Sequence, residues 1–474
     1  MTETATIRPS LAELAEILGG RLLQSDGTQT SGPACIDSRR LSPGDLFVAL
    51  PGASVDGHAF LDRALRAGAC GALVRRDFID EGGRLPNGLA ALCVVAPLEG
   101  LARYGAHLRS RSRALVIGLT GSNGKTTTKE MLAAILAAAV GPRAVLRTEG
   151  NLNNHIGVPL TLTRIGDETR FAVVEMGMNH PGEIAELASL ARPSVGVVTS
   201  IGRAHLEGLG SLEGVARAKA ELFDALPDEG IAVYPAGQAV LEERAGRLAP
   251  ENRWPFGFEA NARVLVETSR AGSGPGQHLV ITCGGQRLSV DLQVPGRHNA
   301  LDAAAAAATA LALGLGEREI VAGLRNFRPA AHRSVITKIG GAQVLDDCYN
   351  ANPTSMEAAL AALTSLPGRS GAILGDMAEL GPEEEDLHGA LLERAVAMGV
   401  ERLILVGPLM AKAAERLSGR MTADGFARGL DAAAAGELAA DWFGEGWNVL
   451  VKASRTTGLE RALDRWRSLV GQRR

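Results

Sequence analysis

The sequence has no clustered cysteines, no excess of one charge and no long apolar run, and each shortage excludes a class of protein. The five cysteines are scattered without a C-x-x-C pair, so the spacing indicates neither a zinc-finger type of site nor a disulfide framework. The most apolar stretches are interrupted by Gly, Arg or Asp well before 18 residues, so no membrane insertion is expected.

The charge balance argues against polyanionic partners. There are 49 basic and 53 acidic side chains, a formal net charge of −4. The chain therefore lacks the basic excess that is typical of nucleic-acid-binding proteins, and we expect no nucleic acid as a partner. An odd number of unclustered thiols suits a reducing compartment. The first eight residues have no apolar segment typical of a signal peptide, and we therefore expect a cytoplasmic protein.

A chain of 474 residues predicts about three domains, and the pattern places them at 1–110, 111–328 and 329–474. The first is expected to be small and mixed α/β. Ser10 and Glu13 form the pattern of a capping box at the start of a short helix. A strand at 45–50, a helix at 58–69 and a strand at 71–74 are expected to follow.

The rest of the chain alternates between strand and helix signals, which predicts an α/β fold with parallel sheets. Residues 114–119 form a continuous apolar run, as expected for a strand buried on both faces, and an apolar stripe predicts a helix at 125–140. The expected result is a central P-loop-type doubly wound sheet and a smaller C-terminal Rossmann-like domain. The other expected strands are 171–175, 195–200, 231–234, 343–346, 371–374, 402–406 and 448–451, with further strands and Gly-rich turns in 257–296; the other expected helices are 213–226, 299–313, 355–366 and 383–398.

The sharpest motif is Thr-Gly-Ser-Asn-Gly-Lys-Thr-Thr-Thr at 120–128, between an expected strand and an expected helix. Glycines let the backbone fold around phosphates, and the helix N-terminus adds positive potential. Lys125 would neutralise phosphate charge and the Thr126 hydroxyl would bind Mg²⁺. The strict pattern requires Gly where this chain has Leu119, so a chance G-K-T in a loop is the alternative.

Two further candidates follow neighbouring strands. Glu175 ends one strand and His205 follows the next, and the carboxyl ends of parallel strands share one edge of a sheet. A carboxylate and an imidazole beside a triphosphate are suitable metal ligands. Each has a structural alternative, a packed carboxylate or a surface histidine. Lys219 in the expected helix 213–226 indicates, by itself, only a solvated side chain.

Several strings in order resemble the Mur ligases. They are the phosphate loop, Gly-Asn-Leu-Asn-Asn at 150–154, Glu-Met-Gly-Met-Asn-His-Pro-Gly-Glu at 175–183, Ala-His-Leu-Glu-Gly at 204–208, Gly-Arg-His-Asn-Ala-Leu at 296–301 and Asp-Asp-Cys-Tyr-Asn-Ala-Asn-Pro at 346–353. The resemblance covers nearly the whole chain, with Asp-Ser-Arg at 37–39 in the first domain. The asparagine-rich strings point to the subfamily that joins D-alanyl-D-alanine to UDP-N-acetylmuramoyl-tripeptide.

The resemblance implies an ATP- and Mg²⁺-dependent ligase that works through an acyl phosphate, which we expect to be a monomer. The first domain would bind the uridine nucleotide, the second ATP, and the third would close on ATP and the incoming dipeptide. Three alternatives stay open: another Mur-type or folylpolyglutamate-type ligase, an ATPase switch without ligase activity, and an inactive scaffold.

Residue roles also follow from the resemblance. The nucleotide contacts would be Gly121, Ser122, Asn123, Gly124, Lys125, Thr126, Thr127, Asn299, Arg333 and Asp347. The metal ligands would be Thr126, Glu175, His205 and Lys219, the last as a carbamate, and these residues with Lys125 would carry catalysis. The substrate contacts would be Asp37, Ser38, Arg39, Asn151, Asn153, Asn154, Asn350 and Asn352.

The chain departs from the family pattern at four positions. His332 stands where Gly is expected, Cys348 where Ser is commoner, His155 where Asp is expected and Ala453 where Gly is expected. The departures at His332 and Ala453 put the geometry of their loops in doubt, but not the reaction. Cys348 has a simple interpretation as a small buried hydrophobe.

Two carboxylates after the expected strand 371–374 leave alternatives open. Asp376 and Glu379 either face the amine site or are solvated loop residues.

Overall fold

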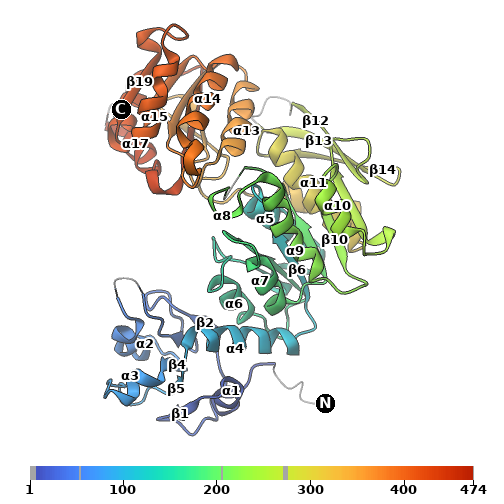
Figure 1. Cartoon of the computed structure of the whole chain (residues 1–474), viewed down its shortest axis with the longest axis vertical. Helices are drawn as coiled ribbons and strands as arrows, with labels where there is room; N and C mark the ends of the chain where they lie inside the picture. Colours follow the sequence, from blue (N-terminus) through green and yellow to red (C-terminus); the bar gives the residue numbers. More distant parts are fainter. Residues whose placement is uncertain (1–6, 53–54, 204–205, 271–275, 473–474) are drawn as a thin grey trace.

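Three α/β parts follow one another along the long axis of the molecule, each built on its own sheet (Figure 1). The computed structural model describes residues 7–52, 55–203, 206–270 and 276–472. Among these residues no helix is both long and apolar enough to cross a membrane.

The N-terminal part has five described strands, all parallel except the antiparallel edge strand β1. In spatial order they are β1 (Arg21–Leu23), β5 (Ala91–Val94), β4 (Gly71–Arg75), β3 (Leu46–Val48) and β2 (Ala34–Cys35). Its helices are α1 (Leu11–Leu18), α2 (Leu61–Arg66), α3 (Arg76–Asp80) and α4 (Pro97–Arg111). The capping box of Ser10 and Glu13 is confirmed. The helix expected at 58–69 is a 3₁₀ turn, Gly57–Phe60, followed by the short α2.

The central part has a nine-stranded sheet in the described residues. In spatial order its strands are β14 (Gln286–Leu292), β13 (Gln277–Cys283), β12 (Val264–Arg270), β11 (Arg253–Gly257), β10 (Ile231–Pro235), β9 (Val195–Val198), β6 (Leu115–Thr120), β8 (Phe171–Glu175) and β7 (Val145–Arg147). The strands from β7 to β12 run parallel, and β13 and β14 add an antiparallel edge. The expected doubly wound sheet is therefore confirmed, with β6 inside it.

Both faces of β6 are buried, as its continuous apolar run predicts. Ile117 and Leu119 pack in one core with residues of α5 (Lys125–Val140), α11 (Arg297–Ala312) and α12 (Glu317–Asn326). Val116 points into a second core formed with α6 (Gly157–Leu162), α7 (Glu183–Ala191) and α9 (Leu212–Asp224). The remaining helices of this part are α8 (Leu206–Leu209) and α10 (Ala239–Ala245). The loop after β6 therefore connects two elements that are both packed in these cores.

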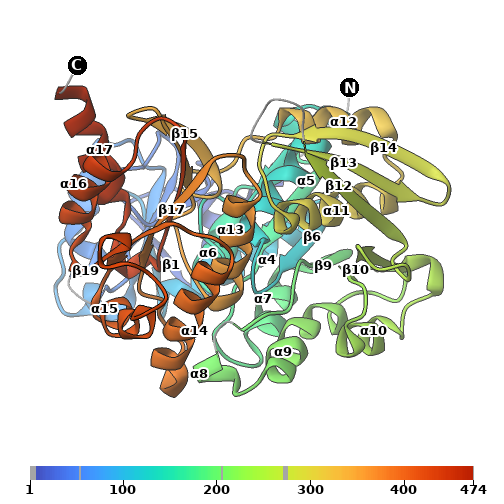
Figure 2. The same cartoon turned by 90° about the horizontal axis from the view of Figure 1, so that it is seen from above.

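The C-terminal part has a six-stranded sheet in the described residues, with the antiparallel strand β15 at one edge. In spatial order its strands are β15 (Val335–Ile339), β16 (Ala342–Asp346), β20 (Trp447–Lys452), β17 (Arg369–Gly375), β18 (Arg402–Val406) and β19 (Phe426–Leu430). Its helices are α13 (Pro353–Thr364), α14 (Glu384–Ala397), α15 (Pro408–Ala413), α16 (Ala432–Trp442) and α17 (Glu460–Gln472). The edge strands and the last two helices were not predicted. Seen from above, α13 lies on the side that faces the central part (Figure 2).

Close packing of α12 on α5 fixes the helix that follows the phosphate loop. A Cβ added at Gly323 in α12 would lie 2.3 Å from Cα of Ile135 in α5. We expect Gly323→Ala to lower the free energy of unfolding of the central part by roughly 1–3 kcal/mol, because the backbone clash outweighs the better helix propensity of alanine. Gly166→Ala is the matched control, since its added Cβ meets no atom within 4 Å. Equal melting temperatures of the two variants in calorimetry would contradict the packing argument.

Candidate active site

The phosphate loop connects β6 to α5 in a conformation that requires glycine. Gly124 precedes the first residue of α5 with φ of 80°, and a Cβ there would lie 2.0 Å from Oδ1 of Asp302. The backbone N–H of Asn123 donates to Oγ of Ser200 after β9 (2.9 Å). Lys125 Nζ donates to the carbonyl of Gly121 (2.6 Å). The loop is therefore held in place before any ligand binds.

A buried carboxylate lies beside the loop, as the strand pattern predicts. Glu175 ends β8 and is 1% exposed. Its Oε2 accepts from Oγ1 of Thr126 (3.1 Å), and its Oε1 accepts from Nδ2 of Asn153 (2.8 Å). A hydroxyl and a carboxylate are the hard oxygen donors that Mg²⁺ prefers. His205 lies outside the described residues.

Three lysines lie at or behind the loop, and two of them, Lys129 and Lys219, are buried, against the ordinary preference of lysine for solvent. Lys219 on α9 is 1% exposed, and its pKa is lowered well below the usual value by burial and by the charge of Lys125. Burial likewise lowers the pKa of Lys125, although Glu175 acts in the opposite direction. Lys129, which the sequence analysis did not single out, is fully buried; its Nζ lies 3.6 Å from Oε2 of Glu175.

A cleft of about 970 Å³ opens between the central and C-terminal parts, within the size range of small-molecule sites. The predicted residues that line it are Ser122, Asn123, Gly124, Lys125, Thr126, Thr127, Asn151, Asn153, Asn154, Glu175, Asn299, Arg333, Asp347, Asn350 and Asn352. Gly121 and Lys219 lie behind this lining rather than in it.

The C-terminal part contacts the loop through Asn352 and places further polar side chains at the same cleft. Nδ2 of Asn352, the N-cap of α13, donates to Oδ1 of Asn123 (2.8 Å). Oδ2 of Asp347 lies 2.5 Å from Nζ of Lys452. The Arg333 guanidinium stacks over the ring of Tyr349 at 4.0 Å. Charged and amide groups of both parts therefore face one space.

The predicted contacts of the first domain lie apart from the cleft. Asp37 and Arg39 pair with each other at 2.8 Å, and the Arg39 guanidinium lowers the pKa of Asp37 to about 2. Ser38 beside them is buried. The part of the chain described before residue 110 contributes no residue to the cleft lining.

The structure separates the two loop carboxylates that the sequence left open. Asp376 caps α15, because its carboxylate accepts from the backbone N–H groups of Leu409 (3.3 Å) and Met410 (2.8 Å). Glu379 lines the cleft. Asp376 is thus committed to holding a helix, whereas Glu379 is part of the cleft wall.

Two polar cleft residues on the first turns of α11 were not predicted. Asp302 lies three residues after Asn299 and four after His298, and residues at these spacings share one side of a helix. Burial raises the pKa of Asp302 well above its usual value and lowers the pKa of His298 to about 4. The helical spacing from Asn299 was the signal available in the sequence.

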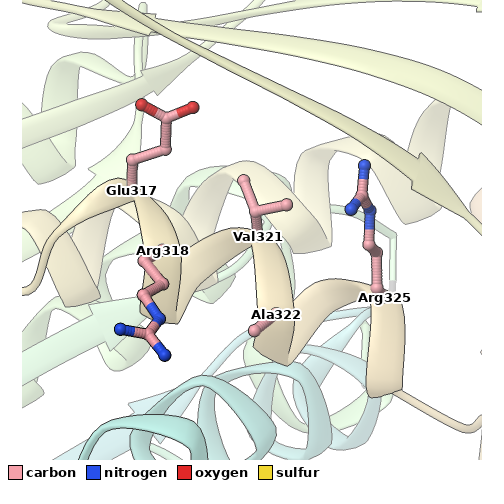
Figure 3. Close-up of a pocket in the computed structure, with 5 residues that line it drawn as sticks. All are labelled: Glu317, Arg318, Val321, Ala322 and Arg325. Atoms are coloured by element: carbon pink, nitrogen blue, oxygen red, sulfur yellow. The ribbon is translucent and has the colours of Figure 1, made fainter.

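A second hollow lies along α12 and is lined by five residues of that helix alone: Glu317, Arg318, Val321, Ala322 and Arg325 (Figure 3). None of them belongs to the phosphate loop or to the charged groups beside it, so this hollow is separate from the candidate site.

A phosphate loop, a buried carboxylate and buried lysines at a junction of α/β parts define an enzyme that acts on nucleotide phosphates. Comparison with known families is more specific. The model of the Mur ligase middle domain matches residues 119–310, that of the Mur ligase glutamate ligase domain matches 332–455, and that of the Mur ligase family catalytic domain matches 34–95. The chain belongs to the Mur ligase family, whose members are ATP-dependent ligases that form C–N bonds.

Individual relatives agree with this assignment over most of the chain. UDP-N-acetylmuramoyl-tripeptide--D-alanyl-D-alanine ligase of Escherichia coli (strain K12) is 40% identical, covering 85% of this chain and 86% of its own. The crystal structure of MurF from Acinetobacter baumannii superposes with a TM-score of 0.83 at 30% identity, covering 97% and 99% of the two chains. MurF ligase from Thermotoga maritima in complex with ADP has a TM-score of 0.79 at 27% identity, covering 94% and 99%.

The depressed pKa of His298 makes stability depend on pH. The unfolded chain protonates this ring below pH 6.5, whereas the folded protein does so only near pH 4. Its contribution to stability is therefore complete above pH 6.5 and is lost as the pH falls towards 4. We expect His298→Gln to show a shallower fall in the free energy of unfolding over this window, measured by urea titration at several pH values. Equal slopes for the variant and the wild type would contradict a ring that stays neutral in the folded protein.

Proposed function

We propose that this ligase joins D-alanyl-D-alanine to UDP-N-acetylmuramoyl-tripeptide, with ATP as the energy source, to give the pentapeptide precursor of peptidoglycan. The observation that carries the proposal is the cleft in which the phosphate loop and Glu175 face Arg333 and Asp347 of the C-terminal part. The Escherichia coli relative, which aligns with 85% of this chain, is named for this activity. The Thermotoga maritima relative has been crystallised with ADP, which supports a nucleotide in the same cleft.

In this proposal the phosphates of ATP lie on the loop from Gly121 to Thr127. The N-terminus of α5 directs backbone N–H groups towards them, and Lys125 compensates their charge. Asn299 would contact adenine. Arg333 would approach the phosphates and Asp347 the ribose, so the nucleotide would join the two parts.

The residues present fit the Mg²⁺ that the family implies. Thr126 and Glu175 already share a hydrogen bond and offer oxygen donors, and His205 and a carbamylated Lys219 would complete the sites. When bound, Mg²⁺ neutralises phosphate charge as the phosphoryl group moves.

The reaction requires two transfers. The terminal carboxylate of the tripeptide attacks the γ-phosphorus of ATP, forming an acyl phosphate and releasing ADP. The amine of D-alanyl-D-alanine then attacks the acyl carbon; phosphate leaves, the amine loses a proton, and the amide bond forms. Lys125 and Arg333 would stabilise charge on the transferring group, and closure of the cleft would exclude water that hydrolyses the acyl phosphate.

The two substrates would enter from different parts of the molecule. Asp37, Ser38 and Arg39 would bind the uridine nucleotide in the domain of residues 1–110. Asn151, Asn153 and Asn154 line the cleft on the central side and would contact the muramoyl-peptide. Asn350 and Asn352 line it on the C-terminal side, where residues 329–474 would receive the dipeptide next to the ATP site of residues 111–328. The cytoplasmic location and the monomeric state stay predictions.

The first test is ATP-dependent phosphate release with UDP-N-acetylmuramoyl-tripeptide, with and without D-alanyl-D-alanine, following the pentapeptide by mass. We expect product only with both substrates, and a loss of at least about 100-fold in kcat for Lys125→Ala, because a charge that stabilises the transition state is removed. Lys338→Ala, which removes an exposed lysine on β15, is the matched control and should keep full activity.

Other outcomes of this test favour the rival activities. Phosphate release that is indifferent to both substrates would favour an ATPase switch. Product formed with glutamate or another single amino acid, and not with the dipeptide, would favour a different amide ligase. A wild type that is inactive under all conditions would favour a scaffold.

The environment of Lys219 supports its carbamylation. Burial and the charge of Lys125 lower the pKa of Lys219, which favours the neutral amine, and a neutral amine adds to CO₂ to form a carbamate with loss of one proton. We expect ¹³CO₂ to give a carbamate signal in the NMR spectrum of the wild type, absent in Lys219→Ala. The Lys219→Arg variant keeps a cation but cannot form the carbamate, so it should lose activity as the alanine variant does. The absence of this signal in the wild type would rule the carbamate out, and a fully active arginine variant would show that activity does not require it.

A further inference from the structure

Three side chains with metal-binding atoms meet at the end of β16, outside the set of residues proposed for Mg²⁺. They are His332, Asp346 and Cys348, and one donor atom from each lies within 4.8 Å of the others. Asp346 ends β16 and Cys348 follows two residues later. His332 comes from the loop before β15, so the cluster joins two separate segments of the chain.

The distances between the donor atoms suit one tetrahedral ion. Nδ1 of His332 lies 3.2 Å from Oδ1 of Asp346 and 3.5 Å from Sγ of Cys348, and Sγ lies 3.1 Å from Oδ1. With Zn–N and Zn–O bonds of about 2.0–2.2 Å and a Zn–S bond of about 2.3 Å, the ligand atoms of a tetrahedron lie roughly 3.3–3.6 Å apart. Small side-chain rotations would bring the three atoms onto three corners of such a tetrahedron.

The backbone holds His332 over the other two residues at a conformational cost. His332 has φ of 61° and Ser334 has φ of 52°, values that residues other than glycine seldom adopt. The segment is fixed from both sides, because the N–H of Tyr349 donates to the carbonyl of His332 (3.1 Å) and that of Ser334 donates to Oδ1 of Asp347 (2.9 Å). Such a strained backbone persists only where the surrounding structure enforces it, and it is often found at functional positions.

Burial and charge favour a cation at this place. Asp346 is 3% exposed and Cys348 is 1% exposed, while the side chain of His332 is 29% exposed and leaves a path from solvent. Burial, together with the neighbouring Asp346 carboxylate, raises the pKa of the Cys348 thiol, so the thiol holds its proton when no metal is present. A divalent cation would displace that proton and neutralise the buried carboxylate.

We propose that His332, Asp346 and Cys348 form a Zn²⁺ site with a water molecule as the fourth ligand. The combination of a thiolate, an imidazole and a carboxylate suits Zn²⁺ and excludes Mg²⁺, which takes oxygen ligands. The bound ion ties the segment before β15 to the end of β16. These two segments carry Arg333 and Asp347, which line the cleft.

The test is a titration of the metal-free full-length chain with Co²⁺ as a spectroscopic substitute for Zn²⁺, in excess Mg²⁺ to occupy oxygen-rich sites. We expect one equivalent of Co²⁺ to give a thiolate-to-cobalt charge-transfer band and the strong visible bands of tetrahedral cobalt. One equivalent of Zn²⁺ should displace it. Zn²⁺ should also raise the melting temperature of the wild type, because the ion binds only the folded chain.

Matched variants assign the band to its ligands. Cys348→Ser should abolish the charge-transfer band and the thermal shift, and His332→Ala should weaken the affinity at least about tenfold. Cys283→Ser and Cys35→Ser, which change two half-buried thiols elsewhere, should leave the band unchanged. Thr126→Ala should also leave it unchanged, which separates the site from the proposed Mg²⁺ residues.

Two results would overturn the proposal. One is a wild type without a thiolate band at stoichiometric Co²⁺, which would leave the cluster as a set of hydrogen bonds. The other is a band that survives in Cys348→Ser or disappears in Cys283→Ser. If the serine variant does not fold, as judged by circular dichroism, the His332→Ala titration decides, because that residue lies in a partly exposed loop.

Discussion

The burial of lysine amines behind the phosphate loop is the constraint on which the site depends. Lys129 and Lys219 are buried, and Nζ of Lys129 lies 3.6 Å from Oε2 of Glu175. Burial lowers the pKa of Lys219 and of the loop residue Lys125, because an ammonium group loses solvation there, and a phosphate beside them would favour their charged forms. The fold tolerates this burial because two packed cores hold β6 and α5 on either side of the loop.

The site also depends on its position between two parts. A phosphate loop alone positions one end of a nucleotide, and it leaves the other end in solvent. In this protein Arg333, Asp347 and Asn352 reach the cleft from a separate sheet, and Asn352 already contacts the loop. A ligand that spans the cleft would therefore stabilise one arrangement of the parts, which is how a hinge closes over reacting groups.

Local sequence patterns predicted the elements whose burial is uniform. The helix at 125–140 and the strands at 171–175 and 402–406 have the bounds that the apolar pattern predicts. An apolar run or stripe directly reflects which faces of the element are buried. The pattern also brought Lys125, Thr126 and Glu175 together. Edge strands such as β15 and β19 were not predicted, because apolar and polar residues do not alternate clearly along these partly exposed strands.

Side-chain environments were less accessible from the sequence. A lysine in a helix signals solvent, and the burial of Lys219 and Lys129 depends on neighbours distant in the chain. The sequence left Asp376 as either an amine-site contact or a solvated loop residue, whereas its carboxylate accepts from backbone N–H groups of α15. The His332 and Cys348 departures from the family pattern were visible separately, but only the antiparallel pairing of β15 with β16 places them together.

Asn352 has two duties that restrict what can replace it. Its Oδ1 caps α13 by accepting from the N–H of Ser355, while its Nδ2 donates to Asn123 in the phosphate loop. Serine would keep a cap but is too short for the second contact. Aspartate would keep the cap and set an acceptor against the acceptor oxygen of Asn123 until that amide turned over, carrying the change into the loop. The start of a helix in one part and the shape of the loop in another thus depend on a single amide. Few residue types can therefore replace asparagine at this position in the course of evolution.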